Sequence, residues 1–491
     1  MPQTETAEIE IRPALPEFLD LMGTFPRVPL VSQKKVQSLN PGRLFQYLFK
    51  NTADCFLLES GKGPESIARY SFFGNARGAP LKVSAGDSTS LASVLEQVGF
   101  SSSSAAFPYI DHFWGGWVGY FSYETVRFLE KIQFRKKTES DLPDVYLIET
   151  DTLFVYDQVE KILKCIVTLP GDRCDSANYH LVLEVLNSWW ERIDAFLELP
   201  AEEPLPCPAE NRAHLKSNMS RADYVLGVER ARRYIEEGDV YQANLAQRFQ
   251  VPCREDPHAL YARLQKLNPS PFGGIFKMDR AAIVSSSPER LVKIDRHWIE
   301  TRPIAGTRPR GADSCEDTRL SEELLLNQKE RAEHLMLVDL ERNDLGRLCE
   351  SGTVHVSDFM FREEYSHVHH IVSNVAGNLR QNLSLLEILQ AVFPGGTITG
   401  CPKIRCMEII DELEPDPRGP YCGSLGYIGY GPYLDLNILI RTILLDGGTA
   451  WFHAGAGIVA DSIPEQEYEE TLNKAAAMLL ALTGKASAPW T

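Results

Sequence analysis

Three long runs of alternating apolar and polar residues constrain the fold of this chain most strongly. Residues 144–169 read DVYLIETDTLFVYDQVEKILKCIVTL, and strand-like runs of the same kind recur at 280–304 and 434–460. Short turns interrupt each run, and strands joined by short turns pair in antiparallel order. The sequence therefore predicts an α+β fold with a large, mostly antiparallel, sandwich-like β-sheet core flanked by helices.

A break in composition divides the chain into two predicted domains. Residues 197–218 hold four prolines and several acids, and they interrupt all periodicity, as is typical of a linker. We therefore expect an N-terminal domain over residues 1–200, a linker over 201–218 and a second domain over 219–486. Strands dominate the first domain, whereas strands and helices mix in the second.

The charge balance excludes several classes of partner. With 50 basic and 67 acidic residues the net charge is −17, whereas general binders of nucleic acid or of anionic membranes need a basic surface. No run approaches eighteen apolar residues, and the first residues lack a secretory signal. The ten cysteines include no CxxC pair, which favours a reducing compartment. We expect a cytoplasmic enzyme that acts on a small molecule.

Two predicted helices carry paired carboxylates. Glu330 and Glu333 share one face of a helix predicted over 321–346, and Glu467 and Glu470 share a face of the last helix. Carboxylates drawn into a partly buried site repel one another and need a cation, for which Mg²⁺ is suited because it prefers hard oxygen ligands. The alternative is a solvated helix face with ordinary salt bridges.

Basic groups lie in two segments that favour anion binding. The run LDLNILIRTILL predicts one strand over 434–445, with Arg441 in apolar surroundings. An arginine there needs an anion, which is either a substrate carboxylate or a protein acid. A predicted helix that starts near Pro402 offers free backbone amides beside Lys403 to a carboxylate.

Two further segments carry titratable groups. Glu289 lies in the predicted turn of SSSPERL, where it is either a salt-bridged turn residue or a general acid with a raised pKa. Strand alternation sends neighbours among His367, His369 and His370 to opposite faces, so we expect one polar contact rather than a metal site. The residues alone thus predict an enzyme with an acid-rich Mg²⁺ site, suited to a small polycarboxylate.

Taken in order, the motifs resemble those of the chorismate-utilising enzymes, which include anthranilate synthase component I, aminodeoxychorismate synthase component I and the isochorismate and salicylate synthases. From about residue 222 to 482 the matching motifs are GDVYQANLAQRF, SSSPERL, TRPIAGTRPRG, KERAEHLMLVDLERNDLGR, VHHIVSNVAG, FPGGTITGCPKIRCMEIIDELEP, GSLGYIGY, LNILIRT, GAGIVADS and EYEETLNKA. FLLES and ARYSFFGN extend the resemblance to the N-terminal part. It implies that residues 219–486 form the chorismate-binding catalytic domain.

The family's functional residues carry over to matching positions of this chain. The resemblance implies Mg²⁺ ligands at Glu333 and Glu470, with Glu330 and Glu467 as companion acids, and a general acid at Glu289 that helps the C4 hydroxyl leave. The implied substrate-binding residues are Tyr427, Arg441, Gly455, Gly457 and Lys474. Thr397 and His370 match positions near the ring and its leaving hydroxyl.

The resemblance also implies the nucleophile. Members that add water carry a lysine base where this chain has Gln242, and a glutamine cannot deprotonate water, so ammonia is expected. The chain contains no recognisable glutaminase segment. A separate glutamine amidotransferase subunit is therefore the implied source of ammonia.

Two aminating activities remain open. Asn244 and the surrounding YQANLAQRF are most similar to aminodeoxychorismate synthase component I, which serves 4-aminobenzoate and folate biosynthesis. Many of those enzymes have a covalent lysine nucleophile where this chain has Ala305, and LLES resembles the tryptophan-binding element of anthranilate synthase, so both features favour the latter enzyme. A catalytically idle partner-binding subunit is a third alternative, which the retained acids and Arg441 oppose.

Overall fold

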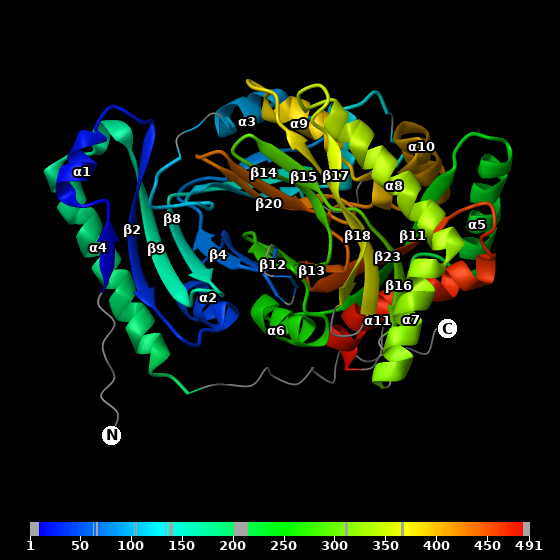
Figure 1. Ribbon diagram of the computed structural model, residues 1–491. Helices are drawn as coiled ribbons and strands as arrows, with labels where there is room; N and C mark the ends of the chain where they lie inside the picture. Colours follow the sequence, from blue (N-terminus) through cyan, green and yellow to red (C-terminus); the bar gives the residue numbers. More distant parts are fainter. Residues whose placement is uncertain are drawn as a thin grey trace.

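The computed structural model describes residues 9–61, 63–64, 67–102, 104, 106–132, 134–136, 141–200, 215–309, 313–364 and 368–484. Two large sheets, in which the strand pairs are antiparallel, form its centre (Figure 1). The first, of 13 strands, runs in the order β1 (Glu10–Arg12), β2 (Arg27–Lys35), β9 (Ile162–Pro170), β8 (Thr152–Asp157), β4 (Tyr70–Asn75), β3 (Cys55–Glu59), β12 (Phe272–Lys277), β13 (Ala281–Ser287), β22 (Thr442–Asp446), β23 (Thr449–Ile458), β11 (Gln242–Pro252) and β10 (Lys216–Ser217), with β19 (Gly400–Cys401) paired to β11.

The second sheet contains 10 strands in the described part of the chain. Its order is β16 (Ile304–Pro309), β18 (Val368–Asn378), β15 (Trp298–Thr301), β14 (Arg290–Asp295), β21 (Tyr433–Asn437), β20 (Ser424–Gly429), β6 (Gly116–Phe121), β7 (Val145–Thr150) and β5 (Leu81–Val83), with β17 (His355–Glu364) paired to β18. Phe276 and Ile283 of the first sheet share one buried cluster with Tyr120 and Leu425 of the second. The two sheets thus form a sandwich, which confirms the predicted α+β class.

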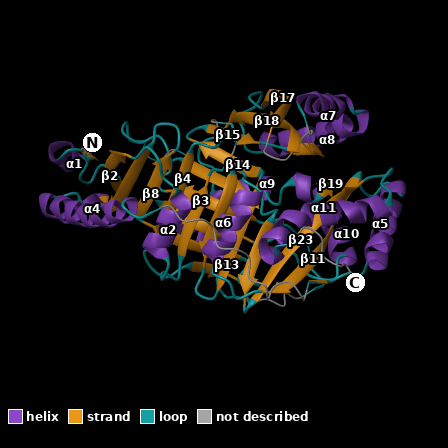
Figure 2. Cartoon of the chain, turned by 90° about the horizontal axis from the view of Figure 1, so that it is seen from below, coloured by secondary structure: helices purple, strands orange, loops and turns teal. Residues whose placement is uncertain are grey.

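Helices cover the outer faces of the sheets (Figure 2). Leu260, Leu264 and Met478 on two of these helices pack with Val284 and Phe452 of the first sheet. The helices are α1 (Leu15–Asp20), α2 (Pro41–Phe49), α3 (Leu91–Val98), α4 (Ser176–Leu197), α5 (Arg221–Glu236), α6 (Pro257–Leu267), α7 (Ser314–Leu326), α8 (Gln328–Gly346), α9 (Leu385–Val392), α10 (Lys403–Leu413) and α11 (Pro464–Thr483), with the 3₁₀ turns η1 (Tyr123–Phe128), η2 (Gly171–Arg173) and η4 (Gly396–Ile398). Within the described residues, no helix is long and apolar enough to cross a bilayer.

Both predicted domains contribute strands to both sheets. β3 pairs with β12 in the first sheet, and β6 pairs with β20 in the second. Residues 201–214 of the predicted linker lie outside the described residues. The predicted boundaries at 200 and 219 therefore stay a prediction, but the two parts share continuous sheets.

Two predicted elements are each divided in the structure. The helix expected over 321–346 is broken at Asn327, whose side-chain oxygen accepts a hydrogen bond from the Glu330 backbone amide at 3.0 Å and so caps α8. The strand expected over 434–445 ends at Asn437 and resumes at Thr442 in the other sheet, with Arg441 at a φ of 51°. The single strand predicted through Arg441 is therefore wrong, because the chain crosses between the sheets there.

Candidate active site

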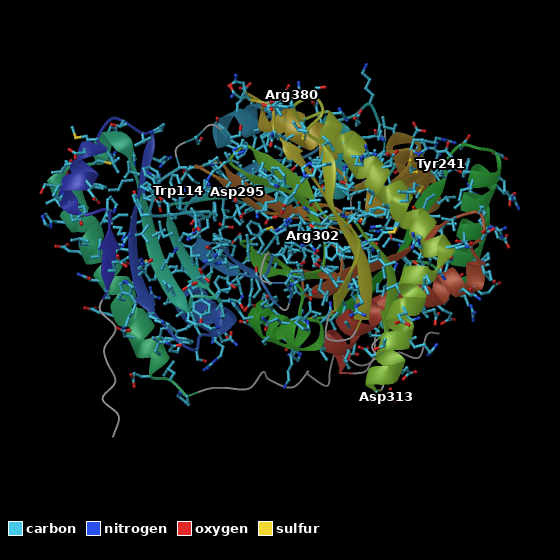
Figure 3. The ribbon with its side chains drawn as sticks, viewed as in Figure 1. Trp114, Tyr241, Asp295, Arg302, Asp313 and Arg380 are labelled. Carbon is cyan, nitrogen blue, oxygen red and sulfur yellow. The ribbon has the colours of Figure 1, made fainter. Side chains whose placement is uncertain are left out.

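The predicted site residues lie mainly where α8 and α11 meet β11, β16, β18 and β23. α11 packs on β23, and α8 packs on β16 and β18. Figure 1 shows these elements gathered at the right of the molecule. Tyr241, which directly precedes Gln242, is labelled in this region in Figure 3.

Two amide side chains of β11 point the same way. Gln242 and Asn244 are two residues apart on this strand and therefore share a face. Gln242 Nε2 donates a hydrogen bond to Glu333 Oε1 at 2.8 Å, which fixes the orientation of the amide. Gln242 Oε1 and Asn244 Oδ1 are both buried and have no hydrogen-bond partner in the part of the chain that the structure describes. The site thus contains two acceptors that a ligand with N–H or O–H groups would satisfy.

The glycines of β23 allow these amides their positions. A Cβ atom on Gly457 would lie 2.5 Å from Gln242 Nε2, and one on Gly455 would lie 2.6 Å from Asn244 Oδ1. Any larger residue would therefore displace the amides. Lys474 Nζ also reaches this strand, where it donates to the Gly455 carbonyl at 3.0 Å. The structure thus brings Gly455, Gly457 and Lys474 together as the sequence predicts.

The carboxylates of α8 and α11 influence one another. Burial raises the pKa of Glu333, and the charges of Glu330 and Glu470 raise it further, whereas the Gln242 hydrogen bond and Lys474 oppose the shift. Glu470 Oε1 lies 2.7 Å from Lys474 Nζ. The two acidic helices are therefore close enough to act together.

These acids suit a hard cation. Among the described residues no group of three or more His, Cys, Asp or Glu side chains forms a complete metal site. Mg²⁺ needs only one or two protein carboxylates, because water and substrate oxygens fill its remaining positions. Glu333, whose ionised form is disfavoured by its acidic neighbours, fits such a cation, and Glu467 lies buried one turn before Glu470.

Glu289 lies buried in the turn between β13 and β14. Burial raises its pKa to about 7, and Thr397, the Ile304 backbone, Arg441 and Lys474 partly oppose this shift. The structure thus places Thr397 and two predicted substrate-binding cations close to Glu289. A carboxyl group with this pKa is protonated in a large fraction of molecules at neutral pH, as a general acid requires.

Ala305 and His370 lie on neighbouring strands. β16 and β18 change register between Ala305 and Thr307, and the intervening Gly306 has a φ of 69°. The Gly306 carbonyl lies 3.2 Å from His370 Nδ1, and a Cβ on Gly306 would meet Glu330 Oε2 at 2.8 Å. This bulge brings Ala305, His370 and Glu330 into one region. His367 lies outside the described residues.

Tyr427 lies elsewhere. It lines a separate cavity of about 540 Å³, together with Glu59, Ser60 and Phe272, and its ring stacks on Phe113 with centroids 4.4 Å apart. Asp295, labelled in Figure 3, also lines this cavity. The resemblance implied that Tyr427 lies with Gly455 and Lys474. The structure instead places Tyr427 in this cavity.

A different tyrosine occupies the expected place. A Cβ on Gly455 would lie 2.9 Å from the hydroxyl of Tyr421, and the Tyr421 ring stacks on His453 with centroids 4.8 Å apart. Sequence reasoning missed Tyr421 because PYCGSLGY contains two tyrosines six residues apart. Only the path of the chain before β20 distinguishes them.

Lys403 also differs from expectation. Its Nζ atom donates to Asp344 Oδ2 at 2.8 Å, and both side chains are largely buried. This cation is therefore neutralised by a protein acid rather than presented to a ligand at the start of α10.

Comparison with known proteins agrees with this arrangement. The chorismate binding enzyme family matches residues 53–480. Anthranilate synthase component 1 of Aquifex aeolicus (strain VF5) is 38% identical over 490 residues, which cover 96% of this chain and 97% of that protein. Aminodeoxychorismate synthase component 1 of Bacillus subtilis (strain 168) is 44% identical over 370 residues, which cover 75% and 77%.

A solved structure gives the same result. Anthranilate synthase component I from Streptococcus pneumoniae TIGR4 matches with a TM-score of 0.71 and 32% identity, over 84% of this chain and 92% of that one. The match thus covers most of both chains. This chain belongs to the chorismate binding enzyme family.

Proposed function

We propose that this protein is aminodeoxychorismate synthase component I, which converts chorismate and ammonia into 4-amino-4-deoxychorismate on the route to 4-aminobenzoate and folate. The observation that carries the choice of ammonia is the pair of buried amide oxygens on Gln242 and Asn244, which have no hydrogen-bond partner among the described residues. They accept hydrogen bonds from N–H groups but cannot remove a proton from water. Ammonia brings its own lone pair and needs no base. The resemblance of the motif around Asn244 favours C4 as the position of attack.

The neighbouring residues support a direct substitution. Glu289 donates its proton to the C4 hydroxyl, which leaves as water while the nitrogen lone pair forms the new C–N bond. The amine is then released as an ammonium group, and Glu289 regains a proton from solvent. Ala305 has only a methyl group, so ammonia attacks the ring without a covalent enzyme intermediate.

Other residues hold the substrate. Arg441 and Lys474 supply positive charge for its carboxylates, and His370 and Thr397 face the reacting part of the ring. Glu333 and Glu470, with Glu330 and Glu467 beside them, would hold Mg²⁺, which when bound neutralises the ring carboxylate. A separate glutamine amidotransferase subunit supplies ammonia in the cell.

A product assay tests the proposal. The pure chain is incubated with chorismate, Mg²⁺ and an ammonium salt, and a lyase that cleaves aminodeoxychorismate is then added. We expect 4-aminobenzoate only after the lyase is present. Direct appearance of fluorescent anthranilate would overturn the proposal.

Anthranilate synthase component I is the second candidate, and the cavity beside Tyr427 favours it. Glu59 and Ser60 of the LLES segment line this cavity, and Tyr261 donates a hydrogen bond to Glu59 Oε2 at 2.8 Å. A carboxyl group among aromatic rings suits the ammonium and indole groups of tryptophan. The relative from A. aeolicus, which is similar over nearly the whole chain, bears that enzyme's name.

A further inference from the structure

A fully buried arginine lies directly behind the amides of β11. Arg418 follows α10, and its side chain is 2% exposed. Its Nε and Nη2 atoms donate to Glu414 Oε2 at 3.0 Å and to Glu414 Oε1 at 2.6 Å. Glu414 Oε1 in turn accepts a hydrogen bond from the Ala246 backbone amide at 2.8 Å. The ion pair is thus attached to β11.

The same guanidinium joins two separate segments of the site. Nη1 donates to the Ile398 carbonyl at 2.9 Å, and Nη2 donates to the Asn244 carbonyl at 2.8 Å. The Asn244 backbone N–H also donates to the Thr399 carbonyl at 2.9 Å. The planar fork of arginine reaches both carbonyls and Glu414 at once, which the single ammonium group of lysine cannot do.

Each segment held by Arg418 carries a polar group of the site. Asn244 bears the Oδ1 atom that has no partner among the described residues. Ile398 follows Thr397, whose side chain lowers the pKa of Glu289. Tyr421, whose backbone amide donates to the Arg418 carbonyl at 3.2 Å, places its hydroxyl beside Gly455. One side chain therefore sets the backbone beneath several groups that surround the reacting atoms.

Stability alone is a weak reason for such a pair. A buried ion pair often contributes no more to stability than well-packed apolar residues of the same size. Here the guanidinium is directed at main-chain carbonyls of functional segments. Its geometry therefore points to the placement of those segments.

We propose that Arg418 is a positioning residue that acts through the carbonyls of Asn244 and Ile398. It sets where the Asn244 side-chain oxygen meets ammonia and where the Thr397 hydroxyl meets Glu289. The inference rests on the proposed function, because ammonia is taken as the group that Asn244 faces. Arg418 itself touches no reacting atom.

The test compares Arg418→Lys and Arg418→Met with matched changes at Arg405. Arg405 lies in the first turn of α10 and also pairs with acids, Asp239 and Glu408, but its side chain is partly exposed at the surface. Initial rates are measured while the ammonium and chorismate concentrations are varied separately, with unfolding followed by circular dichroism.

In Arg418→Lys we expect the KM for ammonium to rise about fivefold, as for the loss of one hydrogen bond, and kcat to fall about tenfold or more. The KM for chorismate should change less than about twofold. Arg418→Met should raise the KM for ammonium and lower kcat further than Arg418→Lys does. The Arg405 variants should stay within about twofold of wild type.

Loss of correctly folded enzyme lowers kcat but leaves both KM values unchanged, so that pattern in Arg418→Lys would overturn the inference. If Arg418→Lys does not fold, Glu414→Gln takes its place, because it keeps an oxygen for the Ala246 amide but loses the charged fork-to-fork contact. An unchanged ammonium KM in Glu414→Gln would also overturn it. A folded wild-type chain that consumes no chorismate would contradict the proposed function instead.

Discussion

At the scale of single residues, burial decides the chemistry of the site. Glu289 and Glu333 have the same side chain, and burial raises the pKa of both. They differ in their surroundings. Lys474 lowers the pKa of both, but Arg441 also lowers that of Glu289, whereas the charges of Glu330 and Glu470 raise that of Glu333. The first is suited to donate a proton and the second to hold a cation.

Glu289→Gln should lower kcat by roughly 10²–10⁴-fold, because the amide cannot donate a proton to the leaving hydroxyl. The wild-type kcat should fall as the pH rises through about 7, since Glu289 acts in its protonated form and its pKa is about 7. This limb should be absent from the variant's pH profile. Less than a tenfold loss would favour a turn-stabilising role, and Glu408→Gln on the exposed side of α10 is the control.

Glu333→Gln and Glu470→Gln should abolish turnover at Mg²⁺ concentrations that saturate the wild type, because each removes a carboxylate suited to the cation. Activity and calorimetric titrations with Mg²⁺ measure the effect. Glu469→Gln is the matched control, since Glu469 is exposed and pairs with Arg221 at 3.5 Å. Normal Mg²⁺ dependence in Glu333→Gln would remove that residue from the site.

At the scale of elements, the sequence predicted whether a segment is a helix or a strand better than where that segment begins and ends. The β22–β23 hairpin turns at Gly447 and Gly448, both with positive φ, at one of the short turns expected within the run 434–460. The crossing from β21 to β22 was missed because Ile438, Leu439 and Ile440 within it are apolar and continue the strand pattern, so no glycine or proline turn marks it. The break before α8 had a signal, since Asn327 is a good N-cap residue within an otherwise helical pattern.

The Asn327 cap connects element stability to the site. Asn327→Ala should lower the free energy of unfolding by about 1 kcal/mol and raise the Mg²⁺ concentration for half-maximal activity, because the cap holds the backbone of Glu330. Ser384→Ala removes a similar cap from α9 and should cost similar stability without changing the Mg²⁺ dependence. Chemical denaturation and activity titrations distinguish the two effects, and equal Mg²⁺ dependence would contradict the link.

At the scale of the whole molecule, the shared sheets explain why some site residues were not predictable. Gln242, Glu289 and Lys474 stand in motifs that the sequence displays, and the structure gathers them in one region. Arg418 and Tyr421 were missed because their importance depends on which backbone carbonyl or glycine lies opposite, which only the packed sheets determine. For the same reason, Tyr427 was predicted at the place that Tyr421 occupies.

The cavity beside Tyr427 joins residues of both predicted domains, from Glu59 to Asn437. If tryptophan binds there, it should raise the midpoint of thermal unfolding, because a ligand of the folded state stabilises it. Glu59→Gln should remove most of this shift by removing the carboxylate that faces the ammonium group. Absence of a shift with millimolar tryptophan would exclude this site.

Under the proposed function, nitrogen from ammonia enters chorismate at C4. Turnover of chorismate with ¹⁵N-labelled ammonium and Mg²⁺, followed by NMR without any lyase, tests it most directly. We expect a ¹⁵N label bonded to C4 of a product that keeps its enolpyruvyl group. Label in anthranilate, together with released pyruvate, would contradict it.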